Sequence, residues 1–293
     1  MVETTEKRQR LLLATPRGFC AGVERAIEVV EIALDLYGPP VYVRKEIVHN
    51  PHVVDALRRK GARFVESEEE VPHGSVVIFS AHGVAPDVRE SAAARDLTTI
   101  DATCPLVTKV HVEAIKYVKD GYSILLIGHA GHDEIIGTMG EAPDAIQLIE
   151  NVQGARRVEV PDPNRVVCLT QTTLSVEDTR DVVSVLRERF PSILVRADIC
   201  YATENRQQAV KAIASDVDLI LVVGAANSSN SIRLMEVARA QGVTSGASTP
   251  EVKVSEVLEY LNAIGFPSSR EIKVVDEDVT FTLPKELRAY RKG

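Results

Sequence analysis

Three cysteines occupy similar places in the chain, each between a stretch that favours an extended segment and a stretch that favours a helix. The clearest is Cys104, within Asp101-Ala-Thr-Cys-Pro-Leu-Val-Thr-Lys109. Pro105 suits the first position of a helix, where its missing N–H costs nothing. Backbone N–H groups at a helix start favour an anion, so we expect this thiolate to be more accessible than that of a core cysteine. Cys20 and Cys200 occupy the same kind of junction far away in sequence.

Two interpretations of these cysteines stay open on spacing alone. A metal ion or cluster shared by the three would explain their positions. Three small buried residues would explain them too, because free cysteine is among the most buried residue types. The sequence has no C-x-x-C pair, which argues against a zinc ribbon. The fourth cysteine, Cys168, lies inside an apolar run and is expected in the core.

Three histidines follow the ends of expected strands. They are His49, His82 and His132, and the last of them is followed by Asp133 and Glu134. Together they can form a cationic, hydrogen-bonding wall for a ligand that carries phosphate. The alternative is that each is an ordinary surface or core histidine. We interpret His52, His73 and His111 in that ordinary way.

Hydroxyl and amide side chains precede several expected helices. Capping of the helix explains part of this pattern, but the same groups at a helix N-terminus also bind phosphate oxygens. Neither G-x-G-x-x-G nor G-x-x-x-x-G-K-S/T occurs, so no nucleotide-binding motif competes for that role. The residues concerned are Thr172, Thr173, Ser228, Ser229, Asn230 and Ser248.

Strands that alternate with helices must position all of these groups. Apolar runs predict strands, among them residues 11–14, 41–43, 76–80, 97–100, 123–127, 166–170 and 219–223, with a closing strand at 279–283. Such alternation predicts parallel sheets with helices on their faces, that is, an α/β fold. Each polar cluster comes just after a strand, where open α/β sheets bind ligands. We expect three similar α/β units, at residues 10–104, 105–198 and 199–293.

Composition narrows the class of protein. With 293 residues and 45% hydrophobic residues, the chain can bury a large core. Its net charge of −8 argues against binding to nucleic acid or to an anionic membrane surface. No apolar run has the roughly 20 residues of a membrane span, and residues 1–10 lack the apolar core of a signal peptide. We therefore expect a cytoplasmic protein whose cysteines are reduced.

Taken together, these segments resemble the IspH/LytB family of 4-hydroxy-3-methylbut-2-enyl diphosphate reductases over nearly the whole chain. The matching motifs include Pro16-Arg-Gly-Phe-Cys-Ala-Gly22, Glu46-Ile-Val-His-Asn50, Ser80-Ala-His-Gly83, Asp101-Ala-Thr-Cys-Pro105, Gly131-His-Asp-Glu134, Gln171-Thr-Thr-Leu-Ser175, Asp198-Ile-Cys-Tyr-Ala-Thr203, Asn227-Ser-Ser-Asn-Ser231 and Gly246-Ala-Ser248. The resemblance implies a trefoil of three α/β domains around a central [4Fe–4S] cluster. It also implies reductive removal of the allylic hydroxyl, which yields isopentenyl and dimethylallyl diphosphate.

The resemblance further implies a role for each site residue. Cys20, Cys104 and Cys200 match the cluster ligands, which leaves one iron without a protein ligand. Glu134 matches the proton-delivering acid, with His132 and Thr172 as its partners. Flavodoxin or ferredoxin is the expected electron donor. The diphosphate pocket is matched by His49, His82, His132, Thr172, Ser228, Ser229, Asn230 and Ser248.

The third unit departs from the family pattern, because the segment between Asn230 and Ser248 is shorter here. We expect the third sheet to lose an element, with lower stability, and Ser248 to be the site residue most affected. Six extended residues span about 20 Å, enough to retrace a ten-residue helix of about 15 Å, so Ser248 can still reach the site. Two rival functions remain: a non-redox iron–sulfur dehydratase, and a degenerate cluster-binding protein without activity.

Overall fold

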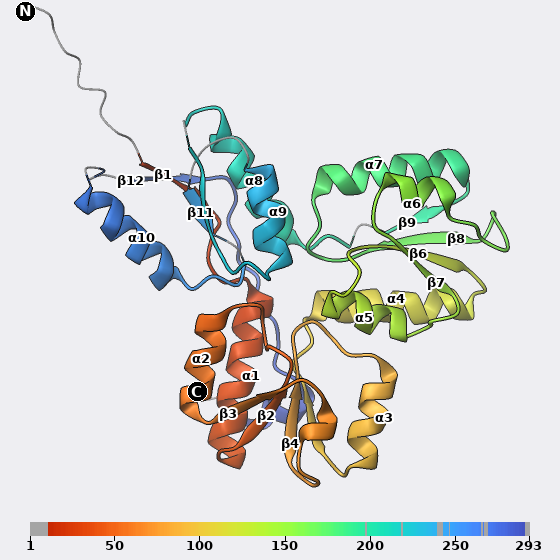
Figure 1. Cartoon of the computed structure of the whole chain (residues 1–293), viewed down its shortest axis with the longest axis horizontal. Helices are drawn as coiled ribbons and strands as arrows, with labels where there is room; N and C mark the ends of the chain where they lie inside the picture. The colour runs from red at the N-terminus through yellow and green to blue at the C-terminus, as the bar shows by residue number, and fades with distance from the viewer. Residues whose placement is uncertain are drawn as a thin grey trace, which may run out of the picture.

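The computed structural model describes residues 11–290 except 197, 218, 239–242, 246, 265, 267 and 268. Within these residues the chain forms three four-stranded parallel sheets. Each sheet and its helices make one lobe, and the three lobes surround a common centre (Figure 1). The expected α/β fold with three sheets is therefore confirmed.

The first lobe is formed by residues 21–101. Its sheet has the order β3-β2-β4-β5, and its strands are β2 (Val41–Arg44), β3 (Ala62–Val65), β4 (Val76–Phe79) and β5 (Thr98–Asp101). The helices are α1 (Ala21–Tyr37), α2 (Pro51–Lys60) and α3 (Pro86–Ala94), with the short 3₁₀ helix η1 (Glu68–Glu70). The apolar face of α1 packs on this sheet in a core that includes Val30, Val43 and Ile78. This packing orients α1 so that its first turn points at the common centre of the three lobes.

The second lobe repeats the arrangement. Its sheet has the order β7-β6-β8-β9, and its strands are β6 (Ser123–Ile127), β7 (Ile146–Ile149), β8 (Val166–Thr170) and β9 (Leu194–Val195). The helices are α4 (Pro105–Lys119), α5 (Asp133–Gly140), α6 (Val152–Arg157) and α7 (Val176–Arg189). All five residues of β8 are buried, including Cys168, as expected for a central strand covered on both faces.

The third lobe contains both the first and the last strand of the described residues. Its sheet has the order β10-β11-β1-β12, and its strands are β1 (Leu11–Thr15), β10 (Leu221–Val223), β11 (Val243–Ser245) and β12 (Ser269–Lys273). The helices are α8 (Tyr201–Ala214), α9 (Ser229–Val237) and α10 (Glu251–Ala263). The expected units differ here, because the strand that we assigned to the first unit pairs in the third sheet. Apolar patterning predicts a strand but does not name its partners.

The shortened segment still supplies a strand to the third sheet. Residues 243–245 form β11, which pairs with β10 on one side and with β1 on the other. Within the described residues this sheet has four strands, like the other two. The expectation that it lacks an element of the family's third sheet stays a prediction. This strand has only three residues, all three of which are in register with β10, and Val243 is also in register with Leu13 of β1.

The C-terminal segment leaves the third lobe and ends on the first. Leu283 and Leu287 are buried in the core beneath α1, and the 3₁₀ helix η2 (Lys285–Tyr290) lies against that helix. The expected closing strand at 279–283 is not present; β12 closes the sheet instead. Residues 274–284 cross between two lobes, and of their apolar residues Leu283 is buried in the core of the first lobe, whereas Val274 and Val279 are exposed.

The helices that begin at the centre do so for local reasons. Asn50 caps α2 by accepting hydrogen bonds from the N–H groups of His52 and Val53, and Pro51 occupies the first helical position. Ser175 caps α7 and Ser228 caps α9 in the same way. Cys20, Cys104 and Cys200 are the residues immediately before α1, α4 and α8.

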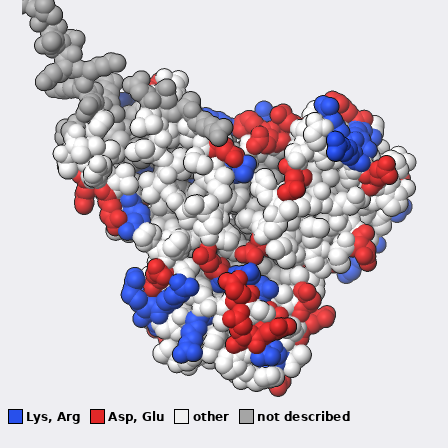
Figure 2. All heavy atoms as spheres, in the orientation of Figure 1, with Lys and Arg blue, Asp and Glu red and all other residues white. Residues whose placement is uncertain are grey.

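Acidic and basic side chains are interspersed over all three lobes on the face drawn in Figure 2. No helix within the described residues is long and apolar enough to cross a membrane.

Candidate functional site

The three cysteines of the helix starts meet at the centre of the trefoil. The backbone N–H of each is fixed by a carbonyl from a loop at the carboxyl end of a neighbouring strand: Cys20 by Ala247 (3.1 Å), Cys104 by Ala81 (3.0 Å) and Cys200 by Thr172 (2.9 Å). Each of these loops also presents a predicted pocket residue, namely Ser248, His82 or Thr172 itself. The backbone thus couples the cysteine positions to the pocket wall.

Gly22 leaves room for the sulfurs. A Cβ on this glycine would lie 2.8 Å from the Sγ of Cys104 and 3.8 Å from the Sγ of Cys20. Both sulfurs therefore face the first turn of α1. Cys200 completes the group, because it lines the same cavity and its charge interacts with that of Cys20. Three sulfur donors around one cavity match the donor set of an iron–sulfur cluster.

The thiols of Cys104 and Cys200 are less acidic than their position before a helix suggested. Burial raises the pKa of Cys104 to about 12 and that of Cys200 to about 11, and the neighbouring thiols raise both further. The N–H groups of Leu106 and Val107 act in the opposite direction on Cys104 but do not outweigh burial. The expectation that the thiolate of Cys104 is more accessible than that of a core cysteine is therefore wrong for the metal-free chain. Cys168 is fully buried in β8, as expected, and lies outside this group.

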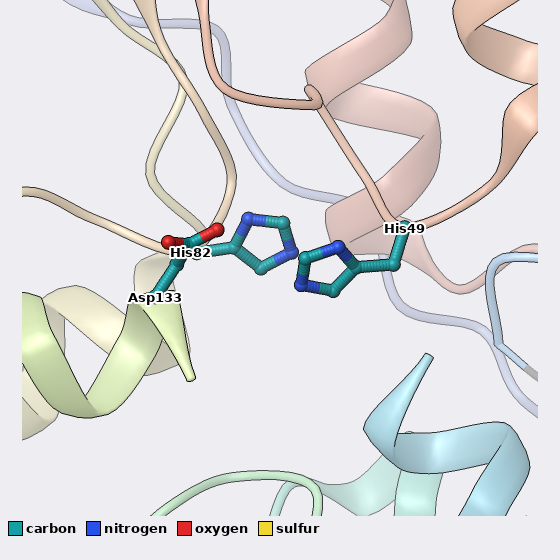
Figure 3. Close-up of side chains that lie close together, drawn as sticks. All are labelled: His49, His82 and Asp133. Atoms are coloured by element: carbon teal, nitrogen blue, oxygen red, sulfur yellow. The ribbon is translucent and has the colours of Figure 1, made fainter. Parts of the chain in front are cut away.

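Three histidine rings form a second wall of the cavity. The rings of His49 and His82 are stacked with centroids 4.0 Å apart, and His132 meets them edge-on at 5.4 and 5.9 Å. Figure 3 shows the first two rings together with Asp133. Ligand atoms of His49, His82 and Asp133 lie within 4.8 Å of one another, close enough for a metal ion. However, imidazole lone pairs lie in the ring plane, and two nearly parallel rings do not direct them at one point.

Hydrogen bonds fix the orientation of the rings. The Nδ1 of His132 accepts the N–H of Glu134 at 3.2 Å, so the proton of the neutral ring is on Nε2. The Nδ1 of His49 lies 3.2 Å from the carboxylate of Glu46. Burial lowers the pKa of His132 to about 4 and that of His82 well below its usual value, and the neighbouring histidines act in the same direction. The rings of His82 and His132 are therefore neutral near pH 7.

Glu134 is a buried acid with a shifted pKa. It is 3% exposed, and burial raises its pKa to about 7, with a further contribution from Asp198. Thr172 donates its backbone N–H at 2.7 Å and its hydroxyl at 2.9 Å to the two carboxyl oxygens. These bonds favour the ionised form but do not cancel the effect of burial. The group can therefore give up a proton near neutral pH.

The serine and asparagine residues form the third wall, at the start of α9. Ser228 caps this helix, and Ser229 bonds to Thr173 at 3.0 Å. The Nδ2 of Asn230 is buried without a hydrogen-bond partner, as expected of a donor that awaits a ligand. Ser248 reaches the site despite the shortened segment, because the side chain of Asn50 holds its carbonyl at 2.7 Å. Its hydroxyl lies 3.5 Å from that of Ser228.

All twelve predicted site residues line this one cavity, which encloses about 770 Å³ of empty space, its open mouth included. The sequence reasoning missed other residues of the lining. Gly22 belongs to a motif that was noticed for its neighbour Cys20. Phe281 carried no local signal, because it reaches the cavity from the C-terminal crossing segment. Apolar residues that complete the lining are Val23, Val48, Leu106, Val107 and Phe281.

Comparison with known proteins shows to which family the chain belongs. Residues 11–242 match the family described as LytB protein. The 4-hydroxy-3-methylbut-2-enyl diphosphate reductase of Streptomyces avermitilis is 52% identical over 312 residues, covering 97% of this chain and 92% of the relative. Reductase 2 of Mycobacterium tuberculosis H37Rv is 53% identical over 311 residues, covering 97% and 93%. Both alignments are longer than the 293 residues of this chain, so the relatives contain residues that it lacks.

Solved structures give the same result. The E-1-hydroxy-2-methyl-but-2-enyl-4-diphosphate reductase of Plasmodium falciparum superposes with a TM-score of 0.92 at 39% identity, covering 95% of this chain and 96% of that one. A second structure, described as the terminal enzyme of the non-mevalonate pathway, superposes with a TM-score of 0.64 at 29% identity, covering 87% and 99%. The resemblance that the motifs suggested is confirmed, and the chain belongs to the LytB family.

Proposed function

We propose that this chain is a 4-hydroxy-3-methylbut-2-enyl diphosphate reductase that catalyses the last step of the non-mevalonate isoprenoid pathway. The observation that carries the proposal is the position of Glu134. A buried acid with a pKa of about 7 lines the same cavity as three cysteine sulfurs and three histidines. Sulfur ligands for a redox centre, donors for a diphosphate and a proton source are the three things that reductive dehydroxylation of an allylic diphosphate requires.

Cys20, Cys104 and Cys200 would hold the [4Fe–4S] cluster of the family. The space beside Gly22 and the three helix N-termini behind the sulfurs support this assignment. When bound, such a cluster supplies two electrons and one iron without a protein ligand, which acts as a Lewis acid. The electrons would come from a flavodoxin or a ferredoxin. The expected cytoplasmic location remains a prediction.

The diphosphate would lie against the histidine and serine walls. His49, His82 and His132 provide ring nitrogens, and the start of α9 provides Ser228, Ser229 and Asn230, with Ser248 beside them. The side-chain amide nitrogen of Asn230, which is buried without a hydrogen-bond partner, supports binding of the diphosphate at the start of α9. N–H groups at a helix start favour an anion, so the pocket binds phosphate without a lysine. The apolar residues of the lining would then contact the five-carbon chain.

Glu134 would deliver a proton to the departing hydroxyl. Thr172 holds both carboxyl oxygens and so keeps the acid at one position, while the backbone around His132 starts the helix that carries it. Overall the substrate takes up two electrons and two protons, its allylic C–O bond breaks, and water leaves. Because the carboxyl is buried, it is reprotonated through the pocket rather than by direct contact with bulk water.

The test is anaerobic purification with iron and sulfide analysis, followed by Mössbauer and EPR spectroscopy with and without substrate. Cys20→Ala, Cys104→Ala and Cys200→Ala should each lower the iron content, whereas Cys168→Ala, a control inside the core, should not. Substrate consumption should require dithionite or reduced flavodoxin. Turnover without a reductant would indicate the dehydratase instead, and a loaded chain that never consumes substrate would indicate a degenerate protein.

A further inference from the structure

Each helix that begins after a site cysteine carries a basic residue in its second turn. They are Arg25 on α1, Lys109 on α4 and Arg206 on α8, which follow Cys20, Cys104 and Cys200 by five, five and six residues. None of the three lines the cavity. Each one instead bonds to the segment that leads to another cysteine, and the three contacts follow the same direction around the trefoil.

Arg25 holds the approach to Cys104. Its Nη1 donates to the carbonyl oxygens of Ala102 at 3.0 Å and Thr103 at 3.1 Å, the two residues just before the cysteine. Its Nε donates to the carbonyl of Thr282 at 2.7 Å, in the C-terminal crossing segment. Arg25 is 8% exposed, so these bonds form away from water. The helix that starts at Cys20 is thereby tied to the cysteine that follows.

Lys109 holds the approach to Cys200. Its Nζ lies 2.8 Å from Oδ1 of Asp198, two residues before that cysteine. The side chain of Asp198 is 0% exposed and also accepts the N–H of Thr170 at 3.4 Å. Lys109 itself is 46% exposed, so it is a partly solvated cation over a buried carboxylate. The helix that starts at Cys104 is thus tied to the third cysteine.

Arg206 closes the circle at Cys20. Its Nη2 donates to the carbonyl of Gly18 at 2.9 Å and lies 3.5 Å from that of Phe19, the residue before the cysteine. Its Nη1 bonds to both carboxylate oxygens of Glu277, at 2.9 and 3.1 Å. The side chain is fully buried. The pairing of β1 in the third sheet is what brings residues 18–20 to this helix.

We propose that Arg25, Lys109 and Arg206 are positioning residues for the cluster, forming a closed ring in which each ties the helix after one cysteine to the segment before the next. This inference rests on the proposed function only in that the three cysteines hold the cluster. The ring fixes the spacing of the three sulfurs before the cluster arrives. It also places positive charge beside Cys104, whose sulfur is a thiolate when it holds the cluster, because the guanidinium of Arg25 bonds to the carbonyl of Thr103, the residue before that cysteine.

Lys109 offers the cleanest test because a partly exposed lysine can be replaced without a cavity in the core. Lys109→Met should keep the metal-free chain folded, as judged by circular dichroism and its unfolding midpoint. The reconstituted variant should lose iron to a chelator about tenfold faster than the wild type, the effect expected from one charge-assisted hydrogen bond to a buried carboxylate. Lys109→Arg, which keeps the charge, should restore most of the retention. The matched control is Lys119→Met, which removes an exposed lysine from the far end of the same helix.

Arg25 tests the electrostatic part. Arg25→Gln should lower the midpoint reduction potential of the bound cluster relative to Arg25→Lys, since only the latter keeps the positive charge near Cys104. Equal rates of iron loss to the chelator in wild type, Lys109→Met and Lys119→Met would overturn the ring. Equal reduction potentials in the two Arg25 variants would overturn its electrostatic part. A wild-type chain that takes up no cluster would instead overturn the proposed function, so the two failures are distinguishable.

Discussion

Thr172 donates a hydrogen bond to each carboxyl oxygen of Glu134, from its backbone N–H at 2.7 Å and from its hydroxyl at 2.9 Å. The carbonyl of the same threonine accepts the N–H of Cys200 at 2.9 Å. One residue therefore connects the buried acid to a cluster cysteine through its backbone. The acid cannot move relative to that cysteine without breaking short hydrogen bonds.

Replacing the acid with its amide should separate binding from turnover. Glu134→Gln keeps the shape of the side chain but removes the proton that the reaction consumes. Loss of a positioned general acid costs typically 10²–10⁴-fold in rate, so we expect kcat to fall by about that factor while substrate still binds. Steady-state assays and calorimetry measure the two quantities. Asp144→Asn, at an exposed position of the same lobe, is the control, and a wild-type kcat in Glu134→Gln would refute the acid role.

The pKa of Glu134 predicts the pH dependence of the rate. Burial raises this pKa to about 7, so the carboxyl is protonated below that pH and ionised above it. A reaction that needs the protonated form should lose rate as pH rises through about 7. The measurement is kcat against pH with a saturating chemical reductant, so that electron delivery does not limit the rate. The residual rate of Glu134→Gln should lack this descending limb; a limb of the same shape in both proteins would assign it to another group.

Diphosphate binding should draw protons into the histidine wall. Burial holds the pKa of His132 at about 4 and that of His82 well below its usual range, so both rings are neutral near pH 7 before the ligand arrives. Negative phosphate oxygens stabilise the imidazolium form and raise these pKa values. Because the complex binds more protons than the free chain, affinity should weaken as pH rises.

Calorimetry in two buffers of different ionisation enthalpy measures this uptake directly. Inorganic pyrophosphate serves as the probe, and the cluster-loaded chain as the receptor. His132→Asn should reduce the number of protons taken up, whereas His73→Asn, at an exposed position outside the cavity, should leave it unchanged. Equal binding enthalpies in the two buffers for the wild type would contradict the prediction.

Much of this site could be predicted because its residues follow strands or start helices. Pro105 after Cys104 and Pro51 after Asn50 mark the helix starts, and parallel sheets collect such positions at one edge. What the sequence could not supply was pairing between distant segments. The apolar pattern of residues 11–14 predicts a strand but not its place beside residues 243–245 and 269–273. The same limit hid Phe281, whose role depends on where the C-terminal segment crosses.

The acidity of the sulfurs was also beyond sequence reasoning. A helix N-terminus lowers the pKa of a thiol, and this effect is present at Cys104. Burial and the approach of two further thiols depend on the assembled trefoil, and they outweigh it. For Ser248 the shortened segment predicted that this residue would be the most affected of the site, although it could still reach it. Its carbonyl is fixed by Asn50, a residue almost 200 positions away in sequence, so its place does not depend on the length of the intervening loop.

Gly22 should be replaceable for folding but not for cluster binding. A Cβ at this position would lie 2.8 Å from the Sγ of Cys104, closer than side chains approach in folded proteins. In the metal-free chain the cysteine side chain can rotate away, and alanine favours a helix over glycine by about 1 kcal/mol. Gly22→Ala should therefore keep or raise the unfolding midpoint of the metal-free protein. With a cluster bound the sulfur cannot move, so iron and sulfide content after anaerobic reconstitution should fall steeply.

Gly154→Ala is the matched control, because this glycine also lies in a helix and its added Cβ would meet nothing nearer than 3.7 Å. It should share the gain in helix stability and keep full iron content. Parallel measurement of unfolding midpoint and iron content in both variants separates the two effects. Wild-type iron content in Gly22→Ala would contradict the prediction. It would mean that the sulfur of Cys104 is not held against the first turn of α1 in the loaded protein, and that this turn does not constrain the cluster.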